Sequence, residues 1–123
     1  MKKKLRILTV DDEPIIGESI ADALEASHRK ISVVKDGHEA LIKAMKEKFD
    51  VIIAVHRMPR TGGLELVRKL RERNYDGKIV VLSGYLSPAN IGTYEELAVD
   101  QIVSKPINSG ELREIIAGLE EEI

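Results

Sequence analysis

The chain has 123 residues, of which 43% are hydrophobic, a size and composition typical of one compact domain. Its net charge of -2, from 19 basic and 21 acidic residues, indicates neither a nucleic-acid-binding surface nor a strongly acidic partner. The absence of cysteine excludes a disulfide framework, thiolate metal sites and thiol catalysis. The sequence shows no export signal and no apolar stretch near the roughly 20 residues of a membrane-spanning helix, so we expect a cytoplasmic protein.

Short apolar runs rich in β-branched residues alternate along the chain with longer segments of helical period. This alternation predicts βαβ units around a parallel sheet, and therefore the α/β class. The expected strands are Arg6 to Val10, Lys30 to Val34, Val51 to Val55, Ile79 to Leu82 and Gln101 to Ser104. The first, third and fourth are almost entirely apolar, so we expect them at the centre of the sheet.

The first two intervals between strands have the spacing of amphipathic helices. Pro14, a residue favoured in the first turn of a helix, precedes apolar residues at four-residue spacing. Asp36, followed three residues later by Glu39, resembles a capping box that opens a second helix. The apolar positions expected in these helices are Ile16, Ile20 and Leu24, and then Ala40, Leu41, Ala44 and Met45.

The sequence marks the last three helices less evenly. The third is expected to run out at Asn74, before an Asp-Gly turn signal. The stretch from Ser87 to Leu97 contains a proline, a glycine and few apolar residues, so a helix there is expected to be short or irregular. The final helix should begin behind a cap formed by Asn108 and Glu111. The expected apolar positions are Leu66, Val67 and Leu70 in the third helix, and Leu112, Ile115, Ile116, Leu119 and Ile123 in the last.

Polar side chains follow three of the expected strands at their carboxyl ends, the edge at which doubly wound sheets bind ligands. The first strand leads to Asp11 and Asp12, the fourth to Ser83 and the fifth to Lys105, whereas the third ends at Val55. Carboxylates supply the hard oxygen ligands that Mg²⁺ prefers, and a hydroxyl and an ammonium suit phosphate oxygens. The pattern therefore indicates an edge built for phosphate chemistry.

These residues and their neighbours resemble the receiver domains of response regulators in two-component signalling, of the chemotaxis-regulator type. The matching segments are Asp11-Asp12-Glu13-Pro14, His56-Arg57-Met58-Pro59 with Gly62-Gly63, Ser83-Gly84 and Lys105-Pro106. The resemblance covers essentially the whole chain and implies a flavodoxin-like, doubly wound, five-stranded parallel sheet with strand order 2-1-3-4-5. It also implies that residues 1–123 form a single receiver domain with no output domain present.

The central position of the site departs from the family. By the resemblance, Asp12 would bind Mg²⁺ directly, Asp11 through water and Arg57 through its backbone carbonyl. The family's phosphoacceptor Asp lies four positions before the proline of the Met-Pro pair, and here that position is Val55. Valine has no nucleophile, so we expect no phosphorylation there and weaker Mg²⁺ binding. Asp50 cannot replace the acceptor, because at about 3.3 Å per residue it lies ~16 Å away along the strand.

Other residues around the acceptor position have roles that the resemblance implies. Ser83 would be the switch hydroxyl, and Lys105 the cation that contacts phosphate, with a cis bond to Pro106. Ile102 takes the place of the family's usual aromatic switch residue, so the switch signal is expected to be muted. His56 follows the acceptor position, but side-chain alternation should point it to the opposite side of the sheet.

The resemblance also implies a partner, a sensor histidine kinase whose helical bundle docks on the first helix and on the loop after the fifth strand. Ile15, Pro106 and Ile107 are candidate contacts, although burial of Ile15 in the core is a competing interpretation. The face formed by the fourth helix, fifth strand and fifth helix is the family's output surface for a possible downstream protein effector. Neither nucleic acid nor membrane is an expected partner of this domain.

Two explanations of Val55 stay open: a substitution that disables an ordinary receiver, or a natural atypical receiver that acts as a phosphate-independent interaction module. Retention of Asp11, Asp12, Ser83 and Lys105 favours the first, because a pocket released from phosphate chemistry would be free to lose more than one member. A phosphatase or flavodoxin-like enzyme is a third hypothesis. The chain has no Asp-x-Asp pair after a strand, dinucleotide fingerprint or Walker lysine, so we expect a signalling domain and not an enzyme.

Overall fold

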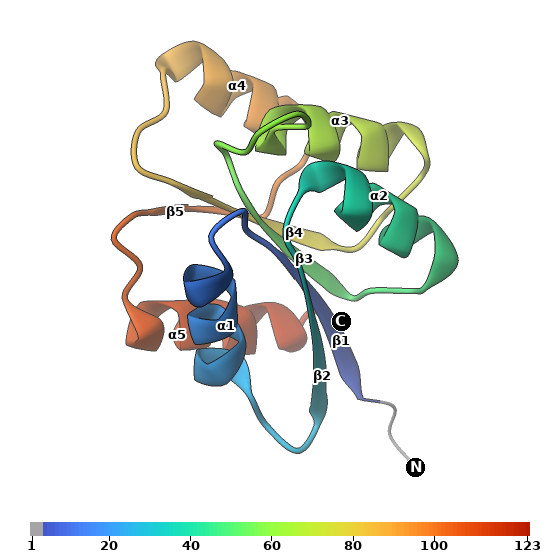
Figure 1. The fold of residues 1–123 in the computed structure, drawn as a ribbon, viewed down its shortest axis with the longest axis vertical. Coiled ribbons are helices and arrows are strands. Elements are labelled where there is room, and N and C mark those ends of the chain that lie inside the picture. The colour runs from blue at the N-terminus through green and yellow to red at the C-terminus, as the bar shows by residue number, and fades with distance from the viewer. Residues whose placement is uncertain (1–3) are drawn as a thin grey trace.

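The computed structural model describes residues 4–123, in which strands and helices alternate (Figure 1). In chain order the elements are β1 (Leu5–Val10), α1 (Pro14–Leu24), β2 (Arg29–Val34), α2 (Gly37–Lys46), β3 (Val51–Val55), α3 (Gly63–Glu72), β4 (Lys78–Ser83), α4 (Pro88–Glu96), β5 (Gln101–Ser104) and α5 (Ser109–Glu120). Within residues 4–123, none of the helices combines the length and apolar character needed to cross a bilayer.

The strands form one parallel sheet in the order β2-β1-β3-β4-β5. The expected fold class and strand order are therefore confirmed. The three apolar strands β1, β3 and β4 are the interior ones, also as expected, because helices bury an interior strand of a parallel sheet on both faces.

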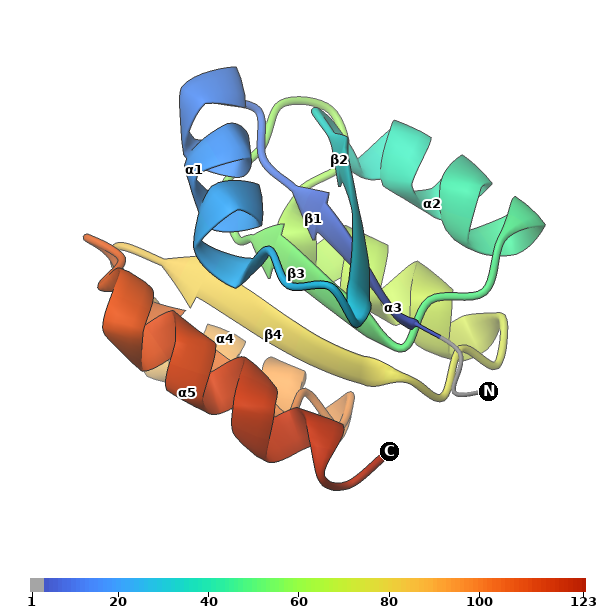
Figure 2. The ribbon, with the colours of Figure 1, turned by 90° about the horizontal axis from the view of Figure 1, so that it is seen from below.

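Helices cover both faces of the sheet, α1 and α5 on one side and α2, α3 and α4 on the other (Figures 1 and 2). Each face has its own apolar core. Along β3, Ile52 and Ala54 point into the α2–α4 core, whereas Ile53 and Val55 point into the α1–α5 core. This alternation decides which layer each residue after β3 can reach.

The caps read from the sequence begin two of the helices. The Asp36 side chain accepts a hydrogen bond from the backbone N–H of Glu39 at 2.7 Å. The Asn108 side chain accepts one from the backbone N–H of Glu111 at 3.0 Å. Both caps satisfy amide groups that the first turn of a helix leaves without a partner, and both predictions are confirmed.

Some expectations near helix ends were wrong. The stretch from Ser87 to Leu97, expected to hold a short or irregular helix, forms the nine-residue α4, which is short but regular, and the Ser87 side chain caps the Asn90 amide at 3.2 Å. By contrast, α3 ends at Glu72, close to the expected end, and Asn74 has φ 64°, the left-handed conformation common after a helix. Met45 and Ile123, expected in the core, are 48% and 58% exposed. Met45 lies outside the buried stripe of α2, and Ile123 lies beyond the end of α5.

Arg71 of α3 joins the ends of three elements. Its guanidinium group donates to four backbone carbonyls at 2.8 to 3.1 Å. These carbonyls belong to Tyr75, Gly77, Leu97 and Ala98. One side chain therefore satisfies acceptors before β4 and just after α4, which fixes the C-terminal end of α4 against α3.

Replacement of Arg71 by lysine should lower the free energy of unfolding by about 2 kcal/mol, because an ammonium cannot reproduce the planar fork of donors. Urea denaturation measures the change. Arg68→Lys is the matched control, since Arg68 is exposed on the same helix. Equal stability of the two variants would contradict the role given to Arg71.

Candidate functional site

The carboxyl ends of β1, β3, β4 and β5 meet at one edge of the sheet. Val10 pairs with Ala54, Val55 with Leu82, and Ser83 with Ser104. This register brings together the strand-end residues singled out from the sequence, which are Asp11, Asp12, Val55, Ser83 and Lys105. Asp50 lies at the opposite edge, where its side chain accepts from the Arg6 backbone N–H at 2.8 Å, as its place before β3 predicted.

An acidic cluster follows β1. Carboxylate oxygens of Asp11, Asp12 and Glu13 lie within 4.8 Å of one another. Asp11 is 1% exposed, and its Oδ1 accepts from the Glu13 backbone N–H at 2.9 Å. Its Oδ2 is buried without a hydrogen-bond partner among the described residues. An unpaired buried oxygen beside further carboxylates is a donor set that fits Mg²⁺.

Ionisation of the Asp11 carboxyl is unfavourable at this buried position. Burial raises the pKa of the Asp11 carboxyl above its ordinary value, and this effect outweighs the lowering by the Glu13 amide and by Lys105. Asp12 and Glu13 raise it further through charge repulsion. Burial and the neighbouring carboxylates together therefore disfavour the ionised form of Asp11.

Val55 forms the apolar wall of a cavity of about 360 Å³ beside this cluster. Its side chain is 2% exposed and packs into the α1–α5 core. The rim includes Arg57, Ser83, Tyr85, Asn90 and Lys105. The Ser83 hydroxyl donates to the Tyr85 carbonyl at 2.9 Å, so it is engaged with the β4–α4 loop. The cavity thus offers a cation and hydrogen-bonding groups, but position 55 supplies no carboxylate.

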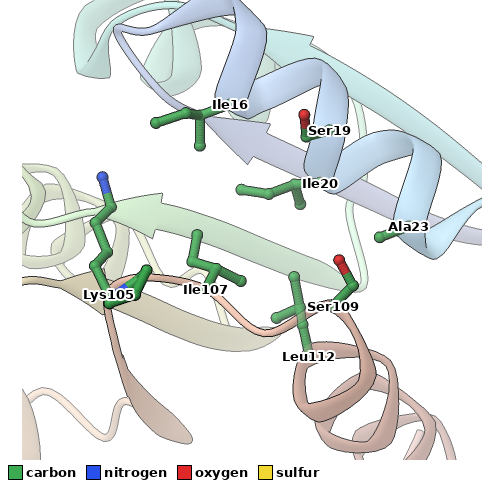
Figure 3. Close-up of a pocket in the computed structure, with 9 residues that line it drawn as sticks. Ile16, Ser19, Ile20, Ala23, Lys105, Ile107, Ser109 and Leu112 are labelled. Carbon is green, nitrogen blue, oxygen red and sulfur yellow. The ribbon is translucent and has the colours of Figure 1, made fainter.

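A second cavity, of about 240 Å³, opens between α1 and the segment after β5 (Figure 3). Its mostly apolar lining includes Ile16, Ile20, Ala23, Lys105, Ile107 and Leu112. Ile15 is 79% exposed near it, so the interpretation of Ile15 as a core residue was wrong. Pro106 is exposed, and its bond to Lys105 is cis, in agreement with the resemblance. The three candidate partner contacts therefore adjoin an apolar groove.

The side chains of His56 and Ile102 lie in the α2–α4 layer. Ile102 is half-buried and packs against the α2–α4 core. Nδ1 of His56 lies 2.6 Å from the hydroxyl of Tyr94 in α4, which confirms that His56 points away from the Val55 side. Burial lowers the pKa of the His56 ring, and the neighbouring Arg57 lowers it further. Tyr94 was missed from the sequence, where its only signal is an aromatic residue in a stretch with few apolar side chains.

Comparison with known families assigns the chain. A family model for the response regulator receiver domain matches residues 7–117. The chain belongs to this family. It is 32% identical over 108 residues to the response regulator MprA of Mycobacterium leprae (strain TN), covering 88% of this chain and 47% of MprA. It is 31% identical over 107 residues to the transcriptional regulatory protein ResD of Bacillus subtilis (strain 168), covering 87% of this chain and 44% of ResD. The chain thus spans about half the length of these relatives.

Solved receiver structures have the same fold. The chemotaxis protein CheY4 of Vibrio cholerae aligns with a TM-score of 0.87 at 29% identity, covering 94% of this chain and 98% of CheY4. A CheY-like receiver domain from Methanospirillum hungatei JF-1 aligns with a TM-score of 0.89 at 27% identity, covering 98% of this chain and 97% of that one. This receiver domain is therefore a signalling domain of the two-component type and not a classical enzyme.

Asp11→Asn should stabilise the receiver domain at neutral pH without divalent cations, because asparagine can accept the Glu13 hydrogen bond without burying a charge. Since burial raises the folded-state pKa of Asp11, the gain is full above that pKa and disappears as pH falls below about 4, where both states are protonated. Thermal unfolding in EDTA at neutral and acidic pH measures it. A gain that grows toward acidic pH would contradict this account.

Proposed function

We propose that this chain is the receiver domain of a phosphorelay that docks a sensor histidine kinase, but that Val55 occupies its phosphoacceptor position and prevents phosphorylation. The observation that carries the proposal is the buried valine side chain at the end of β3, beside the acidic cluster and Lys105. Valine offers neither a nucleophile nor a metal ligand, whereas the surrounding groups suit phosphoryl transfer.

The proposed metal ligands are Asp12, Asp11 through water, and the Arg57 backbone carbonyl. When bound, Mg²⁺ neutralises charge on a transferring phosphoryl group. The missing carboxylate at Val55 should weaken this binding, because each carboxylate adds a hard oxygen ligand and a negative charge. Asp11 supports this assignment, since its buried Oδ2 has no hydrogen-bond partner among the described residues.

Ser83 and Lys105 would contact phosphate oxygens if position 55 carried an acceptor. Ser83 would first give up its hydrogen bond to the Tyr85 carbonyl. We propose Ser83 and Ile102 as the switch pair, with a muted output to any protein effector, because isoleucine has no hydroxyl to exchange partners with. The alternative is an atypical, phosphate-independent receiver, and acetyl phosphate labelling of Val55→Asp distinguishes it from a disabled one.

Val55→Asp should gain one phosphoryl group, about 80 Da, on incubation with Mg²⁺ and acetyl phosphate, while the parent chain gains none. Intact-mass spectrometry measures the increment. Val55→Asn is the matched control, because it introduces a polar side chain of similar size without a nucleophilic carboxylate.

The two outcomes of this labelling test support different functions. Labelling of Val55→Asp alone means that the pocket is competent and that the chain is a receiver disabled at its acceptor. If Val55→Asp also stays unlabelled, the proposal fails and a phosphate-independent interaction module becomes the function that the groove supports.

Kinase docking is proposed for the groove between α1 and the segment after β5. Ile15, Pro106 and Ile107 adjoin it, and the 79% exposure of Ile15 leaves a large apolar side chain for a partner to cover. Exposed apolar anchors beside a groove are typical of the residues that dominate small interfaces. None of the three is needed for the chemistry at position 55, so binding can persist without phosphorylation.

In the Val55→Asp background, Ile15→Ser should slow phosphoryl transfer from a phosphorylated sensor kinase about tenfold, because truncation of one interface anchor costs more than about 1 kcal/mol. Labelling by acetyl phosphate should not change, since that donor needs no docking. Ile42→Ser is the control, because Ile42 is 43% exposed on α2, across the sheet. An equal effect of both variants on kinase transfer would refute docking through Ile15.

A further inference from the structure

A partly buried hydrogen bond joins His56, just after β3, to α4. Nδ1 of His56 and the hydroxyl oxygen of Tyr94 are 2.6 Å apart, and the two rings meet edge to face, with centroids 5.6 Å apart and planes at 75°. Tyr94 is 0% exposed and is the buried residue of α4. The position of α4 in the core therefore depends strongly on this one side chain.

Two backbone hydrogen bonds connect His56 to β4 and to the start of α3. Its N–H donates to the Leu82 carbonyl at 2.8 Å, and its own carbonyl accepts from the Gly63 N–H at 2.9 Å. A Cβ placed on Gly63 would lie 3.1 Å from the Tyr94 hydroxyl oxygen and 2.5 Å from the Val55 carbonyl oxygen. The Tyr94 hydroxyl is thus packed against the turn at which the loop after β3 returns to begin α3.

Two further attachments of α4 lie at its ends. Ser87 caps the first turn at the Asn90 amide, and Arg71 binds the carbonyls of Leu97 and Ala98 beyond the last turn. Between these ends the helix presents mostly small or polar side chains. A helix with so little buried apolar surface opens easily unless its central contact is maintained.

We propose that the His56–Tyr94 hydrogen bond couples cation binding at the acidic cluster to the stability of α4. The proposal rests on the proposed function, because it takes the Arg57 carbonyl as a Mg²⁺ ligand. A bound cation would fix the backbone of Arg57, and with it the adjacent His56 that holds Tyr94. His56 and Tyr94 are positioning residues in this scheme.

This route differs from the switch implied by the family resemblance, which runs through Ser83 and Ile102. Ile102 lacks a polar atom that could exchange partners, whereas the His56–Tyr94 bond directly joins the loop after β3 to α4. Binding of a cation could therefore reach the α4 surface without a phosphoryl group.

Hydrogen–deuterium exchange of the full chain, with and without Mg²⁺, tests the coupling. In the parent, saturating Mg²⁺ should slow exchange of the α4 amides from Ile91 to Leu97 about fivefold. Tyr94→Phe keeps the ring but removes the hydroxyl. It should speed α4 exchange about fivefold without Mg²⁺, the effect of one lost hydrogen bond, and should abolish the slowing by Mg²⁺.

Tyr75→Phe is the matched control. The hydroxyl of Tyr75 donates to the Phe49 carbonyl at 3.1 Å, near the opposite edge of the sheet, so its loss removes a comparable hydrogen bond remote from the cluster. This control should keep the effect of Mg²⁺ on α4. His56→Phe removes the same bond as Tyr94→Phe from the other partner, and provides the test if Tyr94→Phe does not fold.

A thermal-shift titration with Mg²⁺ measures binding separately. If Mg²⁺ binds but does not slow α4 exchange in the parent, the coupling is wrong and the metal site stands. The same conclusion follows if Mg²⁺ still slows α4 exchange in Tyr94→Phe. If Mg²⁺ does not shift the parent's unfolding temperature, the metal site and the coupling are both wrong.

Discussion

Burial of β3 on both faces is the constraint on which the rest of the structure depends. All five residues from Val51 to Val55 are buried, and pairing with β1 and β4 fixes where the strand ends. Alternation then sends Val55 into the α1–α5 layer and His56 toward Tyr94 in the other layer. Two adjacent residues therefore connect one edge of the sheet to both helical layers.

The same edge holds the buried carboxylate of Asp11 beside two further carboxylates. Burial raises the pKa of the Asp11 carboxyl, Asp12 and Glu13 raise it further through charge repulsion, and the Glu13 amide and Lys105 lower it. A further carboxylate at position 55 would add to the crowding, so the apolar Val55 should relieve strain in the cation-free state. Stability without a cation and affinity for one are thus opposed at this edge.

The sequence predicted the features that depend on local side-chain chemistry or on a strong hydrophobic period. Apolar strands gave the interior of the sheet, and side-chain caps gave the starts of α2 and α5. Periodicity did not tell which apolar residues lie outside the buried stripe, so Met45 was misplaced, and Ile15 was left undecided until its exposure was known. The regularity of α4 was not predicted, because Tyr94, which anchors the helix, bonds to His56 from 38 residues away.

In this arrangement, the residues proposed for phosphate chemistry differ from those proposed to bind a partner. Position 55 lies in a strand that must stay buried whatever residue it carries, so valine fits the fold as well as any acceptor could. The groove at α1 and the contact that anchors α4 use other side chains. On the proposed function, valine at that position removes phosphoryl transfer, yet leaves both the proposed surface for a partner and the proposed connection from the acidic cluster to α4.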